Sequence, residues 1–141
     1  MSGFLLDTNC VSELVRTKPH PRVVEWMESV EESLLYLSVL TLGEICKGLA
    51  SLPHGKRRTR LEEWLEVELR ARFADRLLPV DEELALRWGL LAARANRQGK
   101  SLPVIDGLLA ATALHHNLTL VTRNTGDFAI GQVPVLNPWE S

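Results

Sequence analysis

The chain has 141 residues, of which 45% are hydrophobic and 24% charged, and 16 lysines and arginines oppose 18 acids for a net charge of −2. This length predicts one domain over residues 1–141, and the composition excludes a largely disordered chain. No apolar run approaches the roughly 20 residues of a membrane span, and the opening sequence lacks the basic start of a secretory signal. Because two cysteines cannot build a disulfide framework, we expect Cys10 and Cys46 to be core thiols of a cytoplasmic protein.

Short apolar segments alternate with longer amphipathic ones along the chain. The apolar segments predict strands at 3–7, 34–38, 77–80 and 118–122, and an edge strand at 133–137. The amphipathic segments predict helices after Thr8 or Asn9, from Pro21 to about 30, and at 41–52, 55–76, 81–99 and 103–116. This alternation predicts an α/β three-layer sandwich around a central, mostly parallel sheet. In such a sheet, functional side chains gather beyond the carboxyl ends of the strands.

Three acids follow predicted strands closely. Asp7 ends the first strand, Glu44 lies about one helical turn after the second, and Asp127 follows the fourth by five residues. Taken singly, each has a structural explanation: a helix cap for the first, an ion pair with Lys47 for the second, and a turn for the third. Their shared position at one edge of the sheet favours a functional site.

A fourth acid, Asp106, lies in an otherwise apolar helix. Its neighbours one and two turns later are Leu109, Ala110 and Ala113, a stripe that should pack against the sheet. A carboxylate on such a stripe costs several kcal/mol unless a cation or hydrogen-bond donors satisfy it. A helix cap and a nearby arginine are the alternatives to a functional role.

Converging carboxylates predict a cation, because they cannot all stay ionised near one another without one. Oxygen ligands with few histidines or cysteines select Mg²⁺ or Mn²⁺ over zinc. One or two such ions activate a water molecule and stabilise the leaving oxygen of a phosphodiester. The adjacent pair His115 and His116 has no second ligand cluster for zinc, and the motifs of P-loop nucleotidases and serine hydrolases are absent from the sequence.

The segments that carry these acids resemble the four motifs of PIN-domain ribonucleases. They are LLDTN at 5–9, GEICKG at 43–48, PVIDGLLAATA at 103–113 and LVTRNTGDF at 120–128. The sequence is most similar to the VapC-type toxins, particularly their FitB-like branch, from the first strand to the closing VLNPW at 135–139. DTN alone is common, whereas all four segments in this order and at these distances are specific.

This resemblance implies a Mg²⁺- or Mn²⁺-dependent endoribonuclease, the toxin of a type II toxin–antitoxin pair. It implies a homodimer that a small cognate antitoxin neutralises and that, through the antitoxin, assembles on operator DNA. Matched motif by motif, Asp7, Glu44 and Asp106 fall on the family's metal-binding acids. The family's fourth ligand position matches either Asn124 or Asp127 of this sequence. We expect Asp127 to be the fourth acidic ligand. Asn124 would then be a neutral ligand or hold a water molecule.

Other polar residues of the motifs have expected supporting roles. By the same resemblance, Asn9 and Thr122 match positions that hold the acids or the attacking water. We expect Lys47 and Arg123 to bind substrate phosphates. For the basic segment at 54–60, RNA contact and a merely solubilising helix end are equally good interpretations.

Apolar and aromatic side chains on the early predicted helices exceed what a small sheet can cover, which favours a protein–protein surface; ordinary core packing is the alternative. These side chains are Trp26, Met27, Trp64, Leu65 and Phe73. An antitoxin tail that carries arginine would suit an acidic pocket, since a guanidinium bonds a carboxylate through two hydrogen bonds.

Three other interpretations remain open. A Mg²⁺-dependent phosphatase with an aspartate nucleophile also begins with an acid after the first strand, but this chain has Asn9 where that class has a second acid. A phosphoacceptor receiver domain needs an acidic pair after the first strand, and here the pair is missing. A catalytically silent domain of the same fold would bind a partner or RNA without cleavage, but it has no reason to keep costly clustered carboxylates.

Overall fold

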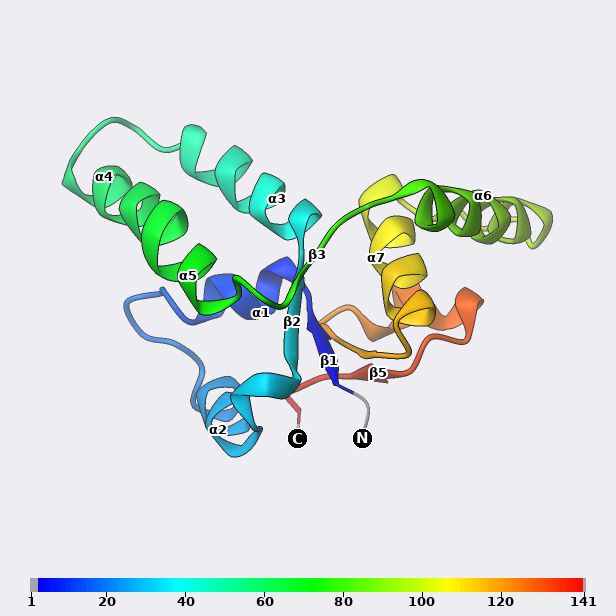
Figure 1. The fold of residues 1–141 in the computed structure, drawn as a ribbon, viewed down its shortest axis with the longest axis horizontal. Helices are drawn as coiled ribbons and strands as arrows, with labels where there is room; N and C mark the ends of the chain where they lie inside the picture. The colour runs from blue at the N-terminus through cyan, green and yellow to red at the C-terminus, as the bar shows by residue number, and fades with distance from the viewer. Residues whose placement is uncertain (1–2, 141) are drawn as a thin grey trace.

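The computed structural model describes residues 3–140 and contains one five-stranded sheet in the order β3-β2-β1-β4-β5 (Figure 1). The strands are β1 (Phe4–Leu6), β2 (Leu35–Ser38), β3 (Leu77–Leu78), β4 (Thr119–Val121) and β5 (Val135–Leu136). All pairings are parallel, and Leu5 in the central strand lies between Tyr36 and Leu120. The five predicted strands are confirmed, including the edge position of β5, although each is shorter than predicted.

Helices cover both faces of this sheet, which confirms the predicted three-layer α/β sandwich (Figure 1). They are α1 (Thr8–Glu13), α2 (Pro21–Ser29), α3 (Val39–Ala50), α4 (Lys56–Glu63), α5 (Arg70–Arg72), α6 (Glu82–Arg97) and α7 (Val104–His115), with the shorter segments η1 (Glu32–Leu34), η2 (Trp64–Leu69) and η3 (Thr125–Gly131). Helices α1 to α5 lie on one side of the strands in Figure 1, and α6 and α7 lie on the other. In the part of the chain described, no helix is both long and apolar enough to cross a membrane.

Two apolar cores hold the layers together, one on each face of the sheet. Leu6 packs into the core beneath α1 to α5, whereas its neighbour Leu5 packs into the core beneath α6 and α7. This division follows from the alternation of side chains along a strand. Leu109, Ala110 and Ala113 of α7 are buried in the second core, as the apolar stripe predicted.

The helices of the first face absorb the apolar side chains that we expected to form a protein–protein surface. Met27, Leu65 and Phe73 are buried in the core, and the half-buried Trp26 and Trp64 pack against it. The inference of an apolar surplus on the early helices is therefore wrong. Ordinary core packing explains these five residues.

Two further sequence expectations need correction. The predicted helix at 55–76 is helical only from Lys56 to Arg72, and its middle segment, η2, is a π-helix. A π-helix adds a residue to the turn, which the helical spacing of apolar residues does not reveal. Cys10 is buried as expected, but Cys46 is exposed, because it lies on the solvent side of α3.

One buried acid escaped the sequence analysis. Glu13, at the end of α1, is only 4% exposed. Its carboxylate accepts hydrogen bonds from the indole Nε1 of Trp139 at 3.3 Å and from the backbone N–H of His20 at 3.0 Å. Glu13 thereby ties the chain's closing segment and the loop before α2 to α1.

We expect the substitution Glu13→Ala to lower the free energy of unfolding by about 2–3 kcal/mol, because it leaves the buried indole N–H of Trp139 and the partly buried backbone N–H of His20 without their acceptor. Denaturant unfolding measures the effect. The matched control is Glu28→Ala, at an exposed position of α2, which should change stability by less than about 0.5 kcal/mol. Equal effects of the two substitutions would show that Glu13 is not a structural anchor.

Candidate functional site

The site begins at Asp7, the residue that links β1 to α1. Asp7 is the N-cap of α1: its Oδ1 accepts from the backbone N–H of Thr8 at 2.7 Å, while its Oδ2 accepts from the hydroxyl of Thr122 at 2.8 Å. The helix cap named as the structural alternative for Asp7 is therefore realised, and the helix begins at Thr8 itself rather than after Thr8 or Asn9. Asp7 is 6% exposed, so its carboxylate is held firmly at the carboxyl end of the central strand.

Burial raises the pKa of the Asp7 carboxyl above its usual value. The hydrogen bonds from Thr122 and Thr8 lower the pKa and offset part of this effect, whereas the neighbouring carboxylate of Glu44 raises it further. The charged form of Asp7 is thus destabilised by both its surroundings and another acid.

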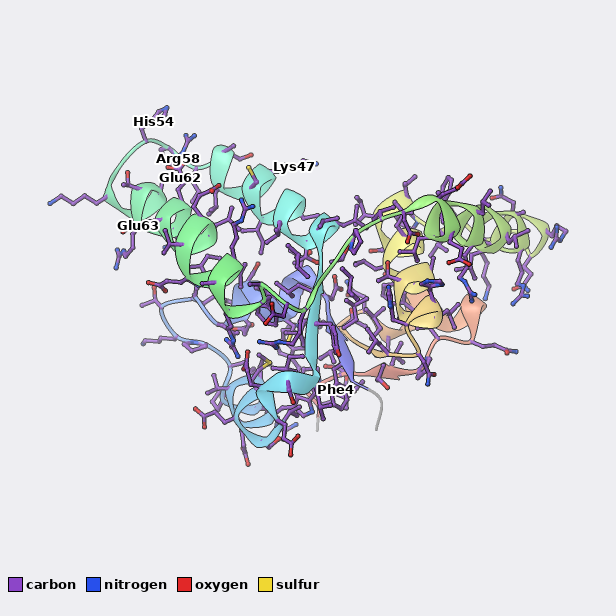
Figure 2. All side chains as sticks on the ribbon, viewed as in Figure 1. Phe4, Lys47, His54, Arg58, Glu62 and Glu63 are labelled. Carbon is purple, nitrogen blue, oxygen red and sulfur yellow. The ribbon has the colours of Figure 1, made fainter. Side chains whose placement is uncertain are left out.

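Glu44 reaches the same place from α3, which begins directly after β2. Its Oε1 accepts a hydrogen bond from the hydroxyl of Thr8 at 2.5 Å. Thr8 therefore joins two acids, through its backbone to Asp7 and through its side chain to Glu44. The alternative of an ion pair with Lys47 is not realised, and Lys47 lies exposed on α3 (Figure 2).

Asp106 lies in the first turn of α7 and is half-buried. It does not cap that helix, whose cap residue is Pro103, and within residues 3–140 its carboxylate pairs with no arginine. Burial is the main cause of its raised pKa, and the charges of Asp7, Asp127 and Glu44 raise it further in that order. The charges of the other three predicted acids, from segments far apart in the sequence, therefore all act on Asp106.

The polar residues predicted around these acids differ in their contacts. Thr122 is fully buried; besides donating to Asp7, its hydroxyl accepts from the backbone N–H of Asn124 at 3.1 Å. Asn124 and Asp127 are exposed, the latter in η3. Arg123 is exposed and stacks over the ring of Trp139 at 5.1 Å.

Thr8, rather than Asn9, makes the polar link on α1. The side chain of Asn9 is exposed and forms no hydrogen bond with the residues the structure describes. The sequence analysis missed Thr8 as a supporting residue. Its only sequence signal is that a hydroxyl directly follows the acid in the DTN motif.

The donor chemistry of the site fits a hard divalent cation. The four acids offer carboxylate oxygens, the ligands that hard cations such as Mg²⁺ prefer. Burial, with the charges of Asp7 and Glu13, raises the pKa of the nearby Cys10 thiol to about 12. Over residues 3–140, no three histidine, cysteine or acidic groups stand close enough to hold an ion as they are placed. Instead the threonine hydroxyls donate hydrogen bonds to oxygens of Asp7 and Glu44, while burial and, after it, repulsion between the acids raise the pKa values of Asp7 and Asp106.

A cavity of about 390 Å³ opens beside the site, lined among others by Thr8, Glu44, Arg16, Arg57 and Trp64. Of the basic segment at 54–60, Arg57 thus faces this cavity. Arg58 instead donates to the carbonyl of Leu52 at 3.0 Å and pairs with Glu62 on its own helix (Figure 2). Arg58 thus stabilises its own helix and Arg57 lines a cavity, while RNA contact by the basic segment stays a prediction.

Comparisons with known proteins find similar sequences along nearly the whole chain. Residues 4–130 match the profile of the PIN domain. The chain is 43% identical to the toxin FitB of Neisseria gonorrhoeae over 96% of its own length and 98% of that protein's. It is 39% identical to the VapC ribonuclease Y4jK of Sinorhizobium fredii over 97% and 98% of the two lengths.

The fold of the chain is also similar to that of solved structures. The crystal structure of FitAcB from Neisseria gonorrhoeae superposes with a TM-score of 0.93 at 42% identity, covering 98% of this chain and 99% of that one. A structure of FitAB bound to the IR36 DNA fragment superposes with a TM-score of 0.91 at 41% identity, covering 96% and 95%.

Proposed function

Since the chain belongs to the PIN-domain family, we propose that it is an endoribonuclease dependent on Mg²⁺ or Mn²⁺ and the toxin of a type II toxin–antitoxin pair. One observation carries the proposal for this chain. Burial raises the pKa of Asp106, and the charges of Asp7, Asp127 and Glu44, held by three different elements, raise it further. Clustered carboxylates destabilise the folded chain unless a positive charge neutralises them, and a divalent cation can supply that charge.

In this proposal Asp7, Glu44 and Asp106 hold the cation, with Asp127 as the fourth acid and Asn124 as a neutral ligand or holder of water. The bound cation would activate water for attack on a phosphodiester and stabilise the leaving oxygen. The chain's own contribution is positioning. Thr122 fixes Asp7, and Thr8 fixes both Asp7 and Glu44, by the hydrogen bonds described above.

RNA is the proposed substrate, and cations around the acids support its binding. Arg57 faces the cavity beside Glu44, while Lys47 and Arg123 lie exposed on α3 and after β4. Such side chains bind phosphates without reading sequence. The net charge of −2 requires that binding come from these local positive patches rather than from the protein as a whole.

The proposed partners are a small antitoxin, a second copy of the chain and, through the antitoxin, operator DNA, in the cytoplasm. Support comes from the relatives, since FitAB has been solved on a DNA fragment. An arginine of the antitoxin would neutralise the acids in place of the cation and bond a carboxylate through two hydrogen bonds. Salt should release it less easily than a surface ion pair, because Asp7 is buried.

The fourth acid should matter less than the others. We expect Asp127→Ala to reduce RNA cleavage by less than Asp106→Ala does, because Asp127 is exposed and Asn124 shares its role. Asn124→Ala should cause a smaller but measurable loss. Initial cleavage rates of the three variants on one RNA give the ranking; equal inactivity of the two aspartate variants would make Asp127 a primary ligand.

A pulse of expression, followed by sequencing of cellular RNA ends, tests the proposal in the cell. New RNA ends should accumulate with the native chain and be absent with Asp106→Asn. Growth arrest without new RNA ends, or with the same ends in both strains, would favour a catalytically silent domain that acts by binding.

A further inference from the structure

Three cavities adjoin one another between α1, the loop after it, and the helical segments α4 and η2. The first, of about 390 Å³, is the cavity beside Thr8 and Glu44 described above. The second, of about 430 Å³, extends along the loop after α1, and the third, of about 570 Å³, extends along α4 and η2 (Figure 1). Because Arg16 and Arg57 line all three, the cavities form one cleft that reaches the candidate site.

The second cavity is lined by positive charge from two separate segments. Its lining residues are Arg16, Thr17, Lys18 and Arg57, three cations and one hydroxyl, which we call the cationic pocket. Residues 16–18 follow α1, whereas Arg57 is in the first turn of α4. A solubilising helix end would not require cations from a second segment to face the same cavity, so the arrangement favours a site for an anion.

The charge of the cationic pocket is little neutralised by the protein itself. Lys18 and Arg57 form no ion pair within residues 3–140. Arg16 contacts Glu13 at 3.5 Å, but the Arg16 side chain is 64% exposed, and the Glu13 carboxylate already accepts two other hydrogen bonds. All three cations therefore remain available to a bound anion.

The cleft is most positive on the side that adjoins the candidate site. Glu63 and Glu68 line the third cavity, where they oppose the charge of Arg60. Among the described residues that line the other two cavities, Glu44 is the single acid, and in the proposed function a divalent cation neutralises it. A polyanion is thus favoured from the acids towards the cationic pocket rather than along η2.

We infer that the cationic pocket binds a backbone phosphate of the RNA that flanks the phosphodiester to be cleaved; this inference rests on the proposed ribonuclease function. An RNA strand carries a phosphate at every nucleotide, so a strand with one phosphodiester near Glu44 can continue through the adjoining cavity to Arg16 and Arg57. Guanidinium groups bond phosphate oxygens through paired hydrogen bonds, and the hydroxyl of Thr17 is a further donor. Such contacts fix the position of the strand at the acids without reading its sequence.

Binding of a fluorescently labelled single-stranded RNA, followed by anisotropy over a salt series, tests the inference. The full chain carries Asp106→Asn, in Mg²⁺, so that the RNA stays intact. In this background Arg16→Gln, Lys18→Gln and Arg57→Gln should each raise the Kd for RNA at least about threefold. Each should also flatten the dependence of log Kd on log salt concentration by roughly 0.7, the contribution of one phosphate contact to a single strand.

The matched control is Arg70→Gln on α5. It removes the same charge from the same side of the sheet, but Arg70 lines none of the three cavities and forms only an exposed pair with Glu66. Its Kd and its salt dependence should equal those of the parent chain. Thermal unfolding should show all four variants folded, since the substituted side chains are exposed.

The outcomes separate this inference from the proposed function. If the native chain cleaves RNA while the three pocket variants bind it with the parent Kd and salt dependence, the inference is overturned and the ribonuclease proposal stands. A native chain that neither binds nor cleaves RNA overturns both. If the pocket variants keep RNA binding but release a co-expressed antitoxin, the cationic pocket holds an acidic segment of that protein and the inference is wrong.

Discussion

Asp106→Asn is expected to abolish RNA cleavage, with a loss of at least about 100-fold in rate, which corresponds to roughly 3 kcal/mol of transition-state stabilisation. Asp106 is the acid on which the charges of the other three converge, and it pairs with no arginine within residues 3–140. The substitution keeps the shape of the side chain and removes one anionic ligand. Single-turnover cleavage of a defined RNA in Mg²⁺ measures the loss.

The matched control for this substitution is Asp75→Asn, at an exposed position before β3. It changes the net charge of the chain by the same amount as Asp106→Asn and should leave the cleavage rate unchanged. Thermal unfolding should show both variants folded. Full activity in Asp106→Asn would remove the basis for assigning the cation to these acids.

Asp7→Asn is expected to have opposite effects on activity and on stability. Cleavage should fall as far as in Asp106→Asn, because the variant also lacks an anionic ligand. In EDTA at neutral pH, however, its Tm should exceed that of the native chain, because a neutral amide avoids both the cost of a buried charge and the repulsion from Glu44. Adding Mg²⁺ should raise the Tm of the native chain more than that of the variant.

The pH dependence gives the sign of this stability effect. Burial raises the pKa of Asp7 in the folded chain above the ordinary aspartate value of 3.8, so the folded state keeps a proton that the unfolded state has already lost. The stability gained from that proton is fully present below pH 3.8 and disappears as the pH rises through the folded-state pKa. The Tm advantage of Asp7→Asn in EDTA should therefore grow between about pH 4 and pH 8. An advantage that shrinks over this range would contradict the assignment of a raised pKa.

Comparing the two proteins at each pH removes other titrations from the result. The pKa of Glu32 is lowered, chiefly by its hydrogen bond from Arg72, so this group loses stabilisation as the pH falls. It is present in both proteins, and its contribution cancels in the difference between their Tm values.

Local sequence signals were sufficient to predict the fold and the sheet edge at which the acids lie. Apolar runs as short as the one ending at Leu6 predict buried strands, and alternation with helices fixes their parallel arrangement. Asp7 and Glu44 follow such strands within a few residues, so the predicted topology already placed them at the same end of the sheet. The choice of four ligands among the acids stays a prediction.

Features set by contacts between distant segments could not be predicted in this way. The hydrogen bond from Thr8 to Glu44 joins residues 36 positions apart in the sequence, and the hydrogen bond from Trp139 to Glu13 joins residues 126 positions apart. Nothing in the sequence next to Thr8 or Glu13 indicates that its side chain bonds to so distant a residue. The exposure of Leu90 likewise depends on how α6 packs against α7, since its sequence spacing alone does not tell an exposed leucine from a buried one.

Cleavage of RNA by the purified chain, with Mg²⁺ and with EDTA, tests the central claim most directly. The native chain should cut an RNA in Mg²⁺ or Mn²⁺, stop cutting in EDTA, and resume when the divalent ion is restored in excess, while Asp106→Asn prepared in the same way should stay inactive throughout. Cleavage that persists in EDTA, or that Asp106→Asn retains, would contradict a site in which these acids act by holding a divalent cation.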